Sequence, residues 1–315
     1  VFDTATVDTN ILIAEKAIYK GVTNACVLDK NFSINNTSDY FNTRFNTIAY
    51  NSNSWTVLST IEQTIKTKIE NLGIPLKEWN IQINYGIKTG YNEAFIIDGN
   101  KRKELIEKCP EADSIIRPIL RGRDIQKYKA NWQNLYIIGT FPSLKIDIEN
   151  YPSIKNHLLS YGFDRLKQTG DLGARKKTHN QWFEIQDSIN YWEDFFRPKI
   201  IYPEITKFIN FYLDTTDHYY VNNKCFILTG VHIEYLTAFF NSKLFKFCFT
   251  ENFPELMGGT RELRKVFFEK IPVMKISDEV NEVFKLKISN FIGLSNKELE
   301  EEINRIIFEL YSFTP

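Results

Sequence analysis

Three short segments of this sequence carry clusters of basic side chains, and each has glycine in it or close to it. The three clusters, with the polar side chains beside them, are Arg121, Arg123 and Lys127; Arg175, Lys176 and Lys177 with Asn180 and Gln181; and Gly259, Thr260, Arg261, Arg264 and Lys265. Arginine and lysine neutralise phosphates, whereas asparagine, glutamine and arginine can form paired hydrogen bonds with base edges. One such cluster is usually a set of solvated loop charges, but three in one domain favour nucleic acid. We therefore predict that they converge into one DNA-facing surface.

The second cluster lies just beyond two glycines, Gly170 and Gly173. Glycine permits backbone conformations that other residues avoid, so we predict a mobile loop here that becomes ordered on a ligand. Its composition makes residues 175–181 our candidate for base reading.

A fourth segment, Tyr85–Asp98 (YGIKTGYNEAFIID), places Lys88 and Thr89 between two glycines. It predicts a turn made possible by Gly86 and Gly90 that leads into a strand ending at Asp98. The N–H groups of such a turn and the Lys88 ammonium could face an anion. The GxxxxGK[ST] spacing of triphosphate-binding loops is absent, so we exclude that kind of site.

The sequence offers no convincing catalytic set. Its four histidines show no HExxH or paired metal spacing, and we expect them to be surface or structural residues: His157, His179, His218 and His232. Glu204 and Lys207 form only an ExxK on a strand-like stretch, so a metal-dependent nuclease stays an alternative that cleavage of plasmid DNA would test.

Composition places the chain among ordinary globular proteins. Of its 315 residues, 43% are hydrophobic and 25% charged, and the formal net charge is zero, so any attraction to nucleic acid must come from local patches. The four cysteines are far apart and show neither zinc nor disulfide spacing, which favours a reducing cytoplasm: Cys26, Cys109, Cys225 and Cys248. We find no signal peptide and no membrane-spanning apolar run. The start at Val1 suggests a fragment of a longer polypeptide.

Hydrophobic periodicity predicts the supporting elements. Apolar residues at helical spacing predict a helix over 58–72, ended by Gly73. The predicted strands are Asn10–Ala14, Ala25–Leu28, Ile81–Asn84, Ala94–Asp98, Leu135–Gly139, Trp182–Gln186, Lys199–Pro203, Phe208–Asp214, Tyr219–Val221 and Cys225–Thr229. The other predicted helices are Lys101–Lys108, Ser153–Leu166, Ile189–Phe196 and Val231–Asn241. Without a regular strand–helix repeat, this pattern indicates a mixed α/β (α+β) domain that is rich in strands.

Two apolar stripes after Pro272 predict amphipathic C-terminal helices. The second begins after Ser295, with Glu298 three residues on as a capping box. Such stripes are usually core faces. A protein-interaction or scaffold domain, docking a methyltransferase or nuclease subunit through these helices, stays open as an alternative.

The order of several motifs resembles a known family. These motifs are GIKTGYNEAFIID, IIRPILRGRDIQKY, QWFEIQD, KIIYPEI, YLTAFFNSKL and GGTRELRKVFFEKIPV. Together they resemble the C-terminal target-recognition (Taq-type specificity) domain of DNA adenine-N6 methyltransferases, in particular its version in fused type IIG restriction–modification enzymes. ATVDTNILIAEKA upstream is similar to the last strands of the preceding methyltransferase domain.

The resemblance implies sequence-specific binding of duplex DNA. It points to Lys88, Thr89, Arg121, Arg123 and the segment Gly258–Arg261 as contacts. It also implies that a methyltransferase domain of the same parent chain flips out the adenine and methylates it from S-adenosylmethionine. The Asn-Pro-Pro-Tyr/Phe motif and the glycine-rich cofactor motif of that domain are absent here. We therefore expect this chain neither to methylate nor to cut DNA alone.

The resemblance also suggests a domain organisation. Residues 1–50 would be the end of a methyltransferase domain plus a connector, 51–78 a linker helix, 79–272 the target-recognition domain, and 273–315 the C-terminal helices.

Overall fold

The computed structural model describes residues 11–18, 20–28, 32–49, 57–253, 255–256, 259–289 and 296–313. The chain divides into two compact units. One comprises Val1–Ile74 with Pro272–Met274, and the other comprises Pro75–Ile271 with Lys275–Pro315. Helices and several small sheets alternate irregularly along the chain, so the predicted mixed α+β class is confirmed.

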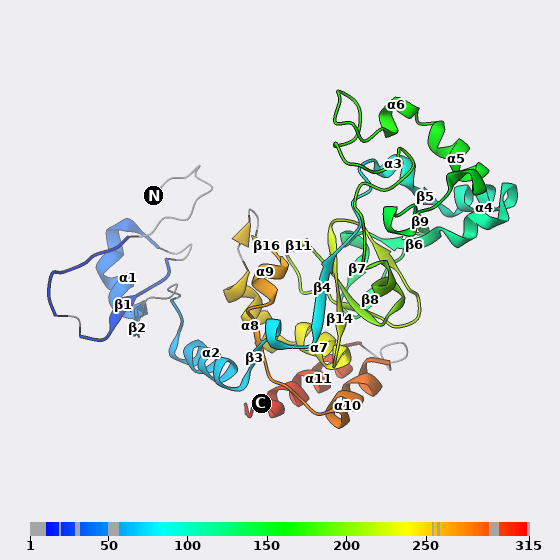
Figure 1. Ribbon diagram of the computed structural model, residues 1–315. Helices are drawn as coiled ribbons and strands as arrows, with labels where there is room; N and C mark the ends of the chain where they lie inside the picture. Colours follow the sequence, from blue (N-terminus) through cyan, green and yellow to red (C-terminus); the bar gives the residue numbers. More distant parts are fainter. Residues whose placement is uncertain are drawn as a thin grey trace. The chain divides into compact units, whose positions relative to one another are not determined.

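The first unit contains a two-stranded antiparallel sheet and two helices (Figure 1). Its elements are β1 (Thr23–Ala25), α1 (Thr37–Arg44), β2 (Asn46–Ile48) and α2 (Thr60–Leu72). Helix α2 was predicted, and a capping box between Ser59 and Glu62 begins it. The strand predicted at Asn10–Ala14 is wrong for residues 11–14, which are irregular because no neighbouring strand pairs with them; Asn10 lies outside the described residues. The strand predicted at Ala25–Leu28 lies earlier, as β1.

The second unit is built on two four-stranded sheets. The first has the order β12-β10-β14-β4 and is antiparallel throughout. Its strands are β4 (Ile81–Tyr85), β10 (Lys199–Pro203), β12 (Tyr212–Asp214) and β14 (Cys225–Gly230). Every residue of β10 is buried: Ile200–Pro203 form its apolar run, and Lys199 is buried in an ion pair with Asp214. Helix α7 (Ile233–Phe240) packs against three of these strands.

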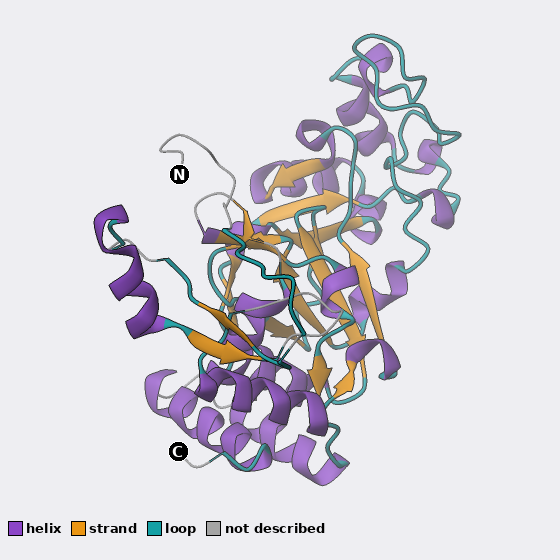
Figure 2. Ribbon diagram, turned by 90° about the vertical axis from the view of Figure 1, so that its left-hand side faces the viewer, coloured by secondary structure: helices purple, strands orange, loops and turns teal. Residues whose placement is uncertain are grey.

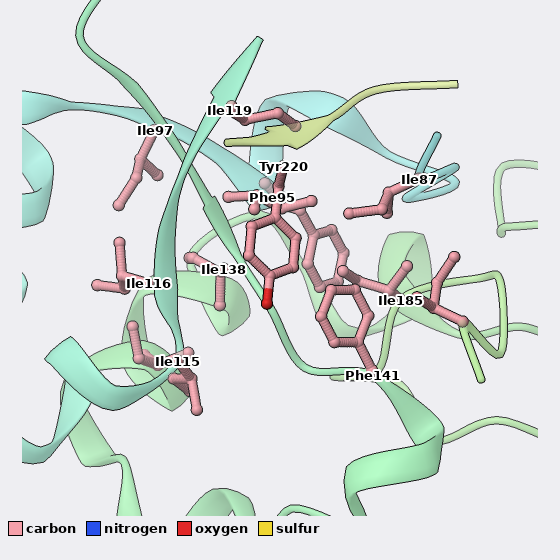
Figure 3. Packing of buried hydrophobic residues seen from close by; sticks show 14 of the residues in the cluster. Ile87, Phe95, Ile97, Ile115, Ile116, Ile119, Ile138, Phe141, Ile185 and Tyr220 are labelled. Atoms are coloured by element: carbon pink, nitrogen blue, oxygen red, sulfur yellow. The ribbon is translucent and has the colours of Figure 1, made fainter. Parts of the chain in front are cut away.

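The second sheet has the order β13-β6-β9-β5, in which only the β13–β6 pair is parallel. Its strands are β5 (Ile96–Asp98), β6 (Ile116–Leu120), β9 (Leu135–Ile138) and β13 (Tyr220–Val221). Figure 3 shows its core, where the ring of Tyr220 stacks with that of Phe141 at a centroid separation of 5.9 Å. Burying these rings provides much of the hydrophobic stabilisation of this part of the unit.

Helices and short elements surround the two sheets. They include α3 (Asn92–Phe95), α4 (Gly99–Lys108), α5 (Pro152–Leu159), α6 (Phe163–Leu166), α8 (Lys243–Asn252), α9 (Lys265–Phe268), α10 (Asp278–Ser289) and α11 (Asn296–Leu310). Short strands of this unit are β7 (Ile125–Gln126), β8 (Lys129–Ala130), β11 (Ile205–Thr206), β15 (Glu255–Leu256) and β16 (Thr260–Glu262), whereas β17 (Pro272–Val273) belongs to the first unit and β3 (Ile74–Pro75) spans the boundary in the chain. β11, β16 and β15 form a three-stranded sheet. Helices α7, α8, α10 and α11 pack together at one end of this unit, and α3, α4, α5 and α6 form a second group at the other end (Figures 1 and 2).

The two predicted C-terminal helices are present as α10 and α11, and their apolar stripes pack inward. Phe284, Leu299, Ile303 and Ile307 are buried, as a core face requires. Among the described side chains of both helices, the exposed large apolar ones are Val283 and Leu286 on α10. The predicted cap Ser295 lies outside the described residues. In the described part of the chain, no helix is long and apolar enough to cross a membrane.

Some predicted elements differ from the structure. Trp182–Gln186 is not a strand, because its backbone bonds with a loop and with a side chain instead of a neighbouring strand. The first residues of Ala94–Asp98 belong to α3. The helix predicted over Ser153–Leu166 breaks at Gly162, whose φ is +91°, into α5 and α6. Ile189–Phe196 shortens to a 3₁₀ turn at Trp192–Phe196, and Phe208–Asp214 shortens to β12.

Candidate nucleic-acid interface

A groove in the second unit brings distant parts of the chain together. It encloses about 510 Å³ and is lined by Tyr85, Lys88, Asp187, Glu204, Asn223, Phe226, Arg264, Lys265 and Val266. We call it the Lys88 groove. Its lining combines three cationic and two carboxylate side chains with an amide and aromatic rings. The predicted turn at Lys88 and the predicted basic segment at Arg264 therefore meet in space.

Two backbone hydrogen bonds hold the start of the Lys88 turn against the end of β13 and the start of β14. The N–H of Gly86 donates to the carbonyl oxygen of Cys225 at 2.7 Å, and that of Ile87 donates to Val221 at 2.8 Å. A Cβ on Gly86 would clash with the carbonyl oxygen of Asn222. Gly90 has a φ of +80°, so the left-handed conformation predicted for this turn is present. Thr89 is buried and its hydroxyl donates to Asn92, so it is a turn-forming residue with no exposed group for DNA.

Arg175 is buried and is not a surface cation, contrary to the prediction. Its side chain donates to the carbonyl oxygens of Leu166, Thr89, Glu184 and Trp182 at 2.6–3.0 Å. Only 2% of the residue is exposed, and burial lowers its pKa to about 10. These hydrogen bonds join the guanidinium to residues on both sides of Arg175 in the sequence and to the Lys88 turn. They hold the loop in place without a ligand. Arg175 positions the loop and does not reach DNA in this conformation.

The neighbours of Arg175 are more accessible. Lys176, Lys177 and Gln181 are exposed, whereas Asn180 donates through Nδ2 to the carbonyl oxygens of Ile185 and Gln186. The Asn180 amide therefore shapes the loop, while the other three side chains face solvent.

The loop presents Asp187 to the Lys88 turn. Its Oδ2 accepts a hydrogen bond from the backbone N–H of Lys88 at 3.1 Å. Burial raises the pKa of Asp187, and this N–H together with the charges of Lys88 and Lys176 opposes the increase. The groove thus contains a half-buried carboxylate whose charged form is favoured by two lysines.

Another part of the groove lining comes from α9 and the residue before it. Arg264 forms an ion pair with Glu262 at 2.7 Å, and Lys265 lies 3.6 Å from Glu269. These exposed pairs contribute little to stability, so both cations can exchange their partners for phosphates at small cost. The N–H of Leu263 donates to the carbonyl oxygen of Glu204 at 2.7 Å and ties this segment to the groove.

The remainder of the third cluster forms β16. Thr260 and Arg261 pair with β15, and Arg261 donates through Nη1 to the carbonyl oxygen of Phe253 at 2.8 Å. Gly259 has a φ of +76°. Gly258 lies outside the described residues. This part of the cluster therefore builds the small sheet that precedes Arg264.

The residues of the first cluster lie in two different places: Arg121 and Arg123 belong to a turn near Lys224, and Lys127 contacts α11. Arg121 donates through Nε to Asp124 at 2.9 Å, whereas Arg123 is exposed. The turn between them approaches Lys224, whose carbonyl oxygen also accepts from Glu204 in the groove. Arg123 thus belongs to a turn beside the groove.

Lys127 does not join the groove, contrary to the predicted convergence. Its ammonium group donates to Glu300 of α11 at 2.6 Å, and both side chains are about 30% exposed. The positive charge of Lys127 is therefore paired with the carboxylate of Glu300 on α11.

Sequence reasoning missed several groove residues. Tyr85, Asn223 and Phe226 carry no charge and match no motif with a known mechanism, so nothing in the sequence separated them from core or loop residues. Tyr85 directly precedes the Gly86 turn. Its side chain belongs to a residue that is 51% exposed, which marks it as a surface aromatic, and only the structure shows this exposure.

The two residues of the alternative catalytic pair have different surroundings. Glu204 lies 3.4 Å from the ammonium group of Lys224, and Lys207 is exposed. No group of three or more metal-binding side chains occurs within the described residues. Among the histidines, His157 lies on α5 and its Nε2 is 3.0 Å from the carbonyl oxygen of Ala94, as expected of a structural residue.

Comparison with known proteins identifies the central part of the chain. Residues 117–273, about half of the chain, match the family model of the TaqI-like C-terminal specificity domain. No curated protein matches the sequence. The structure is similar to that of the type IIL restriction–modification enzyme MmeI, at 10% identity and a TM-score of 0.49, over 76% of this chain and 34% of that one.

A second similar structure is that of the type IIG restriction endonuclease BpuSI. The identity is 14% and the TM-score 0.46, over 81% of this chain and 34% of that one. The chain therefore spans about a third of the length of either enzyme. The family match confirms the predicted assignment: this chain carries a TaqI-like C-terminal specificity domain.

Proposed function

We propose that this chain is the DNA target-recognition module of a restriction–modification DNA adenine-N6 methyltransferase. The observation that carries the proposal is the location of the Lys88 groove. Seven of its nine lining residues fall within the stretch that matches the specificity domain, and Lys88 joins them from outside it. Duplex DNA is the partner that suits a groove of cationic, amide and aromatic side chains.

The two sides of the groove have different tasks in this proposal. Arg264, just before α9, and Lys265, its first residue, are exposed and bind phosphates, which fixes the register of the duplex. The amide of Asn223 and the carboxylate of Asp187 carry the hydrogen-bonding capacity that base edges require. Lys176, Lys177 and Arg123 are available for further phosphate contacts on neighbouring turns.

Catalysis belongs to another part of the parent protein. The methyltransferase domain of the same parent chain binds S-adenosylmethionine and methylates the flipped adenine, while this module holds the target sequence. No residue assigned above to the Lys88 groove takes part in that reaction. The domain boundaries given above, with the target-recognition domain at 79–272 between a linker helix and the C-terminal helices, are part of this proposal.

Binding of random duplex DNA at several salt concentrations tests the proposal. Fluorescence anisotropy of the 315-residue chain should give dissociation constants on the order of 10⁻⁴–10⁻⁶ M at physiological salt, with tighter binding at low salt. The variant Arg264→Ala/Lys265→Ala should lower the slope of log K against log salt by about two, since each phosphate contact contributes about one.

A matched control is Lys103→Ala/Lys285→Ala, which also removes two exposed, ion-paired cations but lies outside the groove. It should retain the slope of the unmodified chain. A folded chain that does not bind duplex DNA at low salt would disprove the proposed function.

A further inference from the structure

Asp187 is unexpected in a groove that holds phosphates. A carboxylate repels phosphates, so its presence needs another explanation. One of its oxygens accepts the N–H of Lys88, and the other has no hydrogen-bond partner among the residues that the structure describes. This second oxygen is an acceptor that the groove leaves free for a ligand.

The position of this carboxylate is built into the fold. The N–H of Gln186 donates to the carbonyl oxygen of Thr89 at 3.2 Å, and Arg175 ties the same loop to the same carbonyl oxygen. On the other side, Ile189 has a φ of +42°, which a β-branched residue rarely adopts, and the hydroxyl of Ser143 donates to its carbonyl oxygen at 3.1 Å. Strain of this kind persists only where the surrounding structure maintains it.

DNA offers only one kind of hydrogen-bond donor to such an acceptor, the amino groups of its bases. In the major groove a carboxylate typically accepts from N4 of cytosine, and a lysine donates to O6 and N7 of guanine. Asp187 is bonded to the backbone N–H of Lys88, and both residues line the groove, so a carboxylate acceptor and the exposed Lys88 ammonium belong to the same part of its wall. That arrangement complements the two halves of one cytosine–guanine pair.

We propose that Asp187 and Lys88 together read one C·G base pair in the major groove of the target. Asp187 accepts a hydrogen bond from the N4 amino group of cytosine, and the Lys88 ammonium donates to O6 or N7 of the paired guanine. This inference rests on the proposed function, since it assigns a base to the same groove.

Glu204 is the less suitable carboxylate of the groove. Its Oε2 lies 3.4 Å from the ammonium group of Lys224, and its backbone is held by Leu263 and Lys224. Its charge is therefore engaged within the protein.

Selection of binding sites from a randomised duplex library tests the assignment. Bound duplexes are recovered with the unmodified chain, with Asp187→Asn, with Lys88→Ala and with the control Asp171→Asn, and are then sequenced. Asp171 is an exposed aspartate of the same loop that does not line the groove. Asparagine keeps an oxygen that can accept the N–H of Lys88, so Asp187→Asn should fold, and circular dichroism checks this.

The unmodified chain and Asp171→Asn should enrich a C·G pair at one fixed position. Asp187→Asn and Lys88→Ala should both relax the preference at that same position, by roughly 5- to 150-fold, and leave other positions unchanged. Enrichment that survives both substitutions, or relaxation at two different positions, would overturn the assignment while leaving target recognition intact. Absence of binding by the unmodified chain would instead refute the proposed function, and this inference with it.

Discussion

Arg175 donates a hydrogen bond through Nη1 to the carbonyl oxygen of Thr89 at 3.0 Å, a contact between residues 86 positions apart. The same side chain donates to three more carbonyl oxygens, those of Leu166 at the end of α6 and of Trp182 and Glu184 in its own loop. A single side chain thus connects the loop that carries Asp187 to the turn that carries Lys88. The geometry of the groove depends on this connection.

Replacing Arg175 with lysine should destabilise the chain. An ammonium cannot reproduce the planar set of donors, so several buried carbonyl oxygens would lose their partners, at a cost of about 3 kcal/mol. Thermal and urea unfolding measure the loss. Lys176→Met, at the exposed neighbouring position, should change the unfolding free energy by less than about 0.5 kcal/mol. Equal effects of the two substitutions would show that the buried guanidinium is not the anchor of the loop.

Lys127→Ala should leave DNA binding unchanged. Its ammonium group is paired with Glu300, so removing it should lower stability by about 0.5–1.5 kcal/mol without altering the salt dependence of binding. The exchanged pair Lys127→Glu/Glu300→Lys should recover part of this stability. A smaller salt slope for Lys127→Ala would place this lysine on the DNA after all.

Lys199→Met should be strongly destabilising. Lys199 and Asp214 form a fully buried ion pair at 2.6 Å, and Asp214 also accepts the N–H groups of Asp217, His218 and Tyr219. Without its cation the buried carboxylate is uncompensated, which typically costs about 3–5 kcal/mol.

Two further variants complete this experiment. Lys199→Met/Asp214→Asn removes the unpaired charge and should be more stable than Lys199→Met alone. Lys103→Met, where the side chain is 78% exposed, serves as the control and should unfold like the unmodified chain. If the double variant is the less stable of the two, the charge of Asp214 is not the cause of the loss.

His157 should make stability depend on pH. Burial lowers its pKa in the folded chain, and the hydrogen bond to Ala94 opposes this only in part. The unfolded chain therefore takes up a proton first as the pH falls through the ordinary histidine range near 6.5, and stability decreases until the pH lies below the folded-state pKa.

Urea midpoints between about pH 5 and pH 8 measure this effect. The variant His157→Gln keeps an N–H donor but does not titrate in this range, so its stability should depend less on pH. His179→Gln changes an exposed histidine and should retain the pH dependence of the unmodified chain. An unchanged slope for His157→Gln would exclude this histidine as the source.

Several elements follow from the sequence because short-range patterns determine them. The apolar run Ile200–Pro203, preceded by Lys199, is a fully buried strand. Apolar spacing at 3.6 residues per turn located α2, α10 and α11. Gly86 and Gly90 indicated the turn around Lys88, since only glycine fits there. The order of motifs was sufficient to predict the specificity domain.

The tertiary structure decided which charged residues are available. The sequence shows that Arg175, Lys127 and Lys88 are cations, but not which of them is buried, paired or exposed. Arg175 is bonded to Thr89, 86 positions away, and Lys127 to Glu300, 173 positions away. The backbone N–H of Lys88 is bonded to Asp187, 99 positions away. Contacts between residues so distant in the sequence arise only when the whole domain packs, because loop closure and burial are properties of the folded chain and not of any short segment.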